Sequence, residues 1–116
     1  MRPRDMAKIG SLVLNNGRWR GKQIVSEKWV KESTKKQAPD PGPAEGYGYQ
    51  WWHFSWTVRD QRITAIQARG YGNQTILVFP PLDLVVVITA WDNGTAVPFI
   101  RLMLLTILPA AVGNGI

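Results

Sequence analysis

A proline-rich segment at residues 38–46 divides the 116-residue sequence into two parts with different hydrophobic patterns. Its three prolines fix φ and remove backbone donors, so a helix cannot continue through it and a surface loop is expected. Before the loop, apolar residues recur at helical spacing. After it, they come in runs that are typical of β-strands. The chain is therefore expected to place N-terminal helices beside a β-sheet.

Two helices are predicted before the loop. The first covers residues 3–16, where apolar residues gather on one face, and Gly17 stops it because Gly takes the left-handed conformation at little cost. A tight turn over 17–21 and a short extended piece follow. Ser26 is expected to cap a second helix that runs to about Ser33, because its side chain can accept a bond from an early backbone N–H.

Aromatic and aliphatic runs after the loop predict the strands. They cover residues 47–56, 62–68, 75–79 and 84–89. The last two runs are joined only by Pro80 to Asp83, so antiparallel pairing is the expected arrangement. Thr95 is expected to cap a final helix that continues to Leu108. That helix is apolar nearly all round, which predicts burial on more than one side.

The predicted fold class is α+β, with an antiparallel sheet of about three strands, two N-terminal helices and a C-terminal helix packed on the sheet. Residues 1–116 are interpreted as a single domain, since 45% hydrophobic residues suffice for one modest core. Such a small sheet offers the apolar final helix only one face. We therefore expect a further layer, a partner chain or the rest of a larger domain.

Composition excludes several classes of function. The net charge of +6 could attract phosphates, but the basic residues are scattered and no complete nucleic-acid-binding signature accompanies them, so a solvated surface is preferred. Without Cys and with a single His, thiolate zinc sites and multi-His metal clusters are excluded, and no cofactor is expected. The longest apolar stretch, 96–112, is interrupted by Arg101 and Pro109, so no membrane span is predicted. No signal-peptide pattern is present at the start, and the compartment stays open.

Five short segments occur in an order that resembles the late part of a known superfamily. They are RPRDMAKIG (2–10), LNNGRWRGKQIVSEKWV (14–30), GYGYQWW (46–52), ARGYGNQ (68–74) and FPPLDLVVV (79–87). The ordered set resembles the C-terminal part of β-lactamase-like serine hydrolases, which include class C β-lactamases, penicillin-binding proteins and related esterases. No single segment is diagnostic. The specificity lies in their order along almost the whole chain.

The resemblance implies acyl transfer by a serine in a Ser-x-x-Lys motif, assisted by a Tyr or Ser in a second motif. A third motif lies on a strand that lines the site. By position, Ala68, Arg69 and Gly70 match this third motif, and the backbone N–H of Tyr71 matches the oxyanion donor, so Gly70 and Tyr71 are the predicted catalytic pair. Substrate contacts are predicted for Ala68, Arg69 and Trp52. Because Ala68 replaces a cationic or imidazole group, a neutral ester or amide is favoured over a penicillin.

The nucleophile itself is not predicted within these residues. Ser33 and Lys36 match Ser-x-x-Lys, but Ser33 falls at an exposed helix end, whereas a catalytic serine needs a buried helix start beside a desolvated lysine. His53 is interpreted as a packing or solvent-facing residue. The expected function is therefore a C-terminal fragment of a serine hydrolase that is inactive alone. The alternative is a non-catalytic remnant or a basic binding module.

Partners follow from the same reasoning. The fragment is expected to associate with the missing N-terminal part of the hydrolase or with a second copy of itself. A small amide or ester would bind only in the complete enzyme. Relatives of this kind are often periplasmic or secreted.

Overall fold

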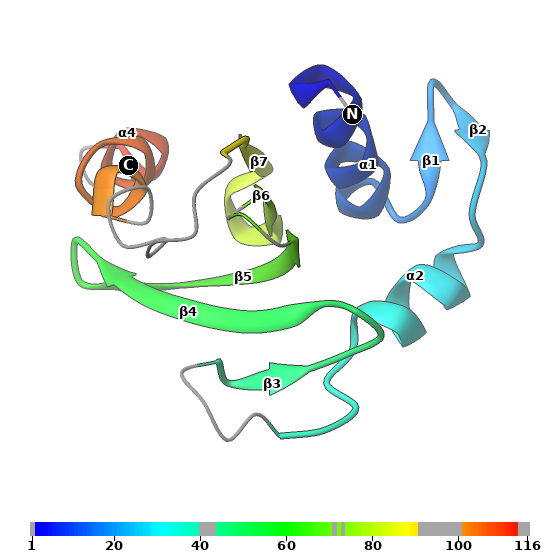
Figure 1. Ribbon diagram of the computed structural model, residues 1–116, viewed down its shortest axis with the longest axis horizontal. Coiled ribbons are helices and arrows are strands. Elements are labelled where there is room, and N and C mark those ends of the chain that lie inside the picture. The colour runs from blue at the N-terminus through cyan, green and yellow to red at the C-terminus, as the bar shows by residue number, and fades with distance from the viewer. Residues whose placement is uncertain (1, 40–43, 71, 73, 91–100, 114–116) are drawn as a thin grey trace.

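A computed structural model describes residues 2–39, 44–70, 72, 74–90 and 101–113. In this part of the chain, helices from opposite ends of the sequence cover the two faces of an antiparallel sheet (Figure 1). The elements are α1 (Pro3–Leu14), β1 (Arg18–Trp19), β2 (Lys22–Gln23), α2 (Glu27–Thr34), β3 (Gly46–Tyr47), β4 (Trp52–Val58), β5 (Gln61–Gly70), β6 (Gln74–Phe79), η1 (Pro80–Leu82), β7 (Leu84–Ile88), the π-helical η2 (Met103–Ile107) and α4 (Leu108–Val112).

Both predicted N-terminal helices are confirmed. Helix α1 begins at Pro3, and the chain leaves it through Gly17, whose φ of 88° is in the left-handed region. Helix α2 starts after Ser26, whose Oγ accepts a hydrogen bond from the Trp29 backbone N–H at 3.1 Å. The cap satisfies one of the amide groups that a helix start leaves without an internal partner.

The turn between the two helices forms a small sheet that was not predicted from the sequence. Strands β1 and β2 pair antiparallel, with Arg18 opposite Gln23 and Trp19 opposite Lys22. Arg20 and Gly21 join them with φ values of 50° and 78°. Two consecutive positive φ values match the right-handed twist of a hairpin, which explains why so short a pair closes here.

The prediction of about three strands in one sheet is wrong. The main sheet has five strands in the order β3-β4-β5-β6-β7, all neighbours antiparallel, and β1-β2 form a second sheet. The expected strand at 47–56 is divided, because the Gly48 N–H donates to the Trp51 carbonyl at 2.7 Å and Gln50 has a φ of 70°. This turn reverses the chain, so β3 and β4 pair as a hairpin rather than forming one strand.

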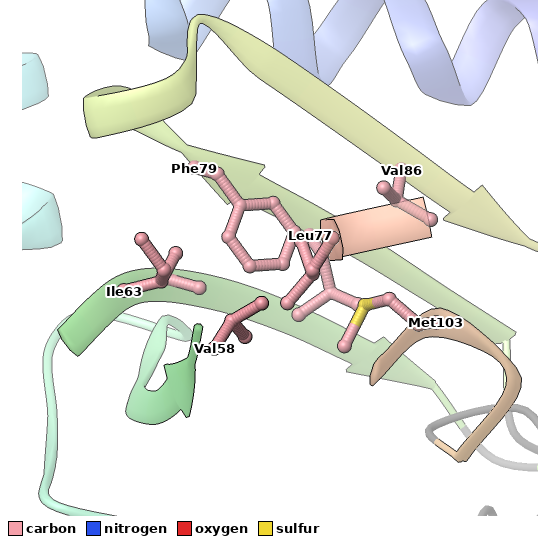
Figure 2. Close-up of a cluster of buried hydrophobic side chains, with 8 residues drawn as sticks. Val58, Ile63, Leu77, Phe79, Val86 and Met103 are labelled. Atoms are coloured by element: carbon pink, nitrogen blue, oxygen red, sulfur yellow. The ribbon is translucent and has the colours of Figure 1, made fainter. Parts of the chain in front are cut away.

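Alternation along the strands gives the sheet two apolar faces. On one face, side chains of β5, β6 and β7 meet the C-terminal helical segment in a core that includes Leu77, Phe79 and Met103, all fully buried (Figure 2). On the other face, Met6 of α1 packs against Ile76 and Val78. Helices α1 and α4 consequently lie on opposite sides of β6 and β7 (Figure 1).

The C-terminal helical segment is buried on one side only. Met103 and Leu108 are 0% exposed, whereas Leu102 and Leu105 are 57% and 66% exposed. The expected burial on more than one side is therefore not met within the described residues. The predicted cap, Thr95, lies outside them. Across the described ranges, no helix combines the length and apolar character that crossing a bilayer requires.

Candidate functional site

The segment matched to the third motif lies at the end of β5. Ala68 pairs with Ile76, Arg69 with Thr75 and Gly70 with Gln74 in the β5–β6 ladder. Ala68 is half-buried and packs on the face that α1 covers, while Arg69 and Gly70 are exposed. Since successive strand residues point to opposite faces, Arg69 does not share a face with Ala68. Tyr71, the predicted oxyanion donor, lies outside the described residues.

Trp52 does not join Ala68. In the β4–β5 ladder Trp52 pairs with Gln67, so its side chain belongs to the face opposite Ala68, and its ring packs on Tyr47 with 4.3 Å between centroids. The predicted substrate contacts are thus divided, with Trp52 and Arg69 on one face and Ala68 on the other. Trp51 packs against the cluster that contains Ala68, and strand alternation alone would have selected it over Trp52.

A pocket with both polar and apolar walls lies on the same face as Ala68, farther along β4 and β5. Its volume is about 230 Å³. Strand pairing places His53 opposite Ile66 and Ser55 opposite Thr64, which brings imidazole and hydroxyl groups beside an aliphatic side chain. The lining residues are Lys36, Glu45, His53, Phe54, Thr64, Ala65, Ile66 and Pro80. This pocket was not predicted from the sequence, because Lys36 and Glu45 come from the segment before β3, far in sequence from the strand residues that they meet.

Glu45 connects the loop to the two strands beside the pocket. Its Oε1 accepts hydrogen bonds from the Ser55 hydroxyl and from Arg62 Nη2, the latter at 2.8 Å, and its Oε2 lies 3.8 Å from Lys36 Nζ. The Ser55 hydrogen bond, followed by the charges of Arg62 and Lys36, holds the pKa of Glu45 below its ordinary value. The carboxylate is therefore ionised at neutral pH, and two hydrogen-bond donors, Ser55 and Arg62, together with the nearby Lys36 ammonium hold its position.

His53 is the one titratable side chain in this pocket that is partly removed from water. Burial lowers the pKa of His53, and a backbone hydrogen bond with Thr34 opposes this shift. Nε2 of the ring is buried and has no hydrogen-bond partner among the described residues. A buried polar atom of this kind calls for a partner, because leaving it unsatisfied costs free energy.

The depressed pKa of His53 predicts how stability depends on pH. The imidazole takes up a proton near pH 6.5 in the unfolded chain, and only at lower pH in the folded chain. The contribution of His53 to the free energy of unfolding is therefore fully present above pH 6.5, and the free energy of unfolding falls as the pH drops below that value. His53 is the only His in the chain, so one NMR titration of its ring protons gives the folded pKa directly. A pKa at or above 6.5, or an unfolding free energy that does not change between pH 7 and about pH 5, would contradict this assignment.

Ser33 and Lys36 do not form a nucleophile pair. The Ser33 hydroxyl donates to the Val30 carbonyl at 3.3 Å within α2, and the Lys36 ammonium lies near Glu45. An activated serine needs a base within hydrogen-bond reach, and here both side chains have other partners.

No protein-family model matches the chain, and no curated protein matches its sequence. The described residues contain no group of three or more His, Cys, Asp or Glu that could hold a metal ion.

Proposed function

We propose that this chain is the C-terminal segment of a β-lactamase-like serine hydrolase that cleaves amide or ester bonds through an acyl-enzyme. In this proposal the end of β5 and the following turn line the reaction site and supply a backbone N–H to the oxyanion. The Ser-x-x-Lys nucleophile comes from a segment outside these 116 residues. The substrate is a small neutral amide or ester.

The observation that supports the proposal most is the place of residues 68–70. They end β5, where they pair with β6 through Ala68–Ile76, Arg69–Thr75 and Gly70–Gln74, whereas the ladder with β4 stops at Gln67. A ladder with β6 holds this backbone in place, and oxyanion stabilisation needs rigid donors because they do not have to reorganise during the reaction. Gly72, in the turn after β5, has a φ of 83°, a left-handed conformation that glycine adopts at little cost.

Hydrolysis assays test the proposal on the purified chain. A p-nitrophenyl ester and a chromogenic β-lactam are expected to show no turnover, and a fluorophosphonate is expected to leave no adduct by mass spectrometry, because the chain has no activated serine. Ser33→Ala is the control. Labelling that disappears in this variant would identify Ser33 as a real nucleophile and would overturn the assignment of the chain as a non-catalytic segment.

The proposal also predicts association through β7. Within the described ranges no strand pairs with the outer edge of β7, and its residues Leu84–Ile88 are all aliphatic, without the charge or proline that protects an edge. We expect the isolated chain to dimerise or form larger species as its concentration rises, measured by light scattering coupled to gel filtration. A monomer that persists at all concentrations would count against an edge that another chain segment normally covers.

A further inference from the structure

The pocket beside His53 is separate from the end of β5 and has a chemistry of its own. Its charged wall comes from Lys36 and Glu45, and its other walls from Thr64, Ile66 and Pro80. We propose that this pocket binds a small organic carboxylate, with the carboxylate at Lys36 and the apolar part of the molecule against Ile66 and Pro80. This binding does not depend on the proposed hydrolase function.

The charges around the pocket favour an anion. Two cationic side chains, Lys36 and Arg62, surround the single carboxylate of Glu45. Arg62 approaches Glu45 Oε1 at 2.8 Å, whereas Lys36 Nζ is 3.8 Å from Oε2, so the arginine and Ser55 already satisfy much of the carboxylate. The Lys36 ammonium has three donors and is 52% exposed, which leaves it able to bind a second carboxylate.

The other walls select for a ligand with an apolar body. Ile66 and Pro80 supply aliphatic surface, and Thr64 adds a hydroxyl beside them. A space of 230 Å³ corresponds to roughly seven or eight water molecules, which is enough for one ring and its carboxylate. Small-molecule sites commonly combine this kind of apolar surface with a few polar groups that set orientation.

His53 contributes a further contact. Its Nε2 is a buried nitrogen without a partner in the described part of the chain, and His53 lines the pocket. Because burial keeps the imidazole neutral, Nε2 can accept a hydrogen bond but does not add charge. A small rotation of the ring upon binding would give this atom a donor, so carboxylates that also carry a hydroxyl are expected to bind more tightly than those that do not.

Titration of the ¹⁵N-labelled chain tests the proposal with benzoate as the probe. Benzoate is expected to shift the amide signals of Lys36, His53 and Thr64, and 4-hydroxybenzoate to do so at lower concentration. Benzamide, which has the same shape without the charge, is expected to bind about fivefold to tenfold more weakly, since a charge-assisted hydrogen bond is lost.

Two variants test the charge of Lys36 and the volume of the pocket separately. Lys36→Gln is expected to weaken benzoate binding about fivefold, while the matched control Lys28→Gln, on the surface of α2, leaves it unchanged. Thr64→Tyr keeps every charge, fills the pocket and is expected to abolish binding. Equal binding of benzoate and benzamide would overturn the proposal. So would the absence of any benzoate-induced shift at Lys36, His53 and Thr64, or shifts that remain unchanged in both Lys36→Gln and Thr64→Tyr.

Discussion

Replacing Phe79 by Ala is expected to lower the free energy of unfolding by about 3–5 kcal/mol. The Phe79 side chain is 0% exposed at the end of β6, and its ring lies 6.1 Å from that of Trp56 on β4. It thereby joins strands that do not pair with each other directly, beneath the C-terminal helical segment (Figure 2). Truncation removes the buried ring and leaves a cavity that neighbouring strands cannot close without breaking their ladder.

Urea unfolding followed by Trp fluorescence measures this change. The control is Ile24→Ala, because Ile24 is 57% exposed and its loss is expected to change the free energy of unfolding by no more than about 0.5 kcal/mol. Domains of this kind have only about 5–15 kcal/mol of stability in total, so Phe79→Ala should remove a large share of it and lower the urea midpoint clearly. Equal effects of the two substitutions would show that the cluster around Phe79 is not the core.

Replacing Gly17 by Ala is expected to cost about 3 kcal/mol or more, and replacing Gly21 by Ala only about 1 kcal/mol. Both glycines have positive φ, 88° and 78°, so both variants carry the same backbone strain. They differ in space, because a Cβ at Gly17 would lie 2.0 Å from the Val25 carbonyl oxygen, while at Gly21 nothing lies within 4 Å.

The overlap at Gly17 cannot be relieved by a side-chain rotation. The Gly17 carbonyl accepts the N–H groups of Ile24 and Val25 at 2.9 and 3.2 Å, and the Gln23 side-chain amide bridges the carbonyls of Asn16 and Val25. Moving Val25 would break this set of bonds, which connects α1 to the start of α2. Thermal unfolding of the two variants side by side measures the difference. Matching losses would mean that strain alone, and not the close approach of backbone, requires glycine at this position.

Local signals predicted the helices well. The stop at Gly17 and the cap at Ser26 act through neighbouring backbone groups, so the residues that form them are close in sequence and can be recognised there. The number of strands in the sheet was harder to predict. A run of aromatic residues at 47–56 has strand propensity throughout, and only the turn at Gly48 and Gln50 divides it into two strands.

The candidate site, like the sheet, depends on contacts between residues that are distant in sequence. Position in the family pattern selected Ala68, Arg69 and Trp52, yet strand alternation and register put Trp52 across the sheet from Ala68. The pocket at His53 combines side chains from the loop, β4 and β5 that lie far apart in the sequence. No spacing rule connects Lys36 to Thr64, because their separation depends on how the loop packs over the sheet.

By itself, the sequence determined where the two N-terminal helices start and stop, and that the second half forms antiparallel strands. Tertiary structure decided that the sheet has five strands, that α1 and the C-terminal segment cover opposite faces, and that Glu45 collects Ser55, Arg62 and Lys36 beside a pocket. The physical reason is range: caps and turns are satisfied within a few residues, whereas strand register and the contents of a pocket depend on which distant surfaces bury each other.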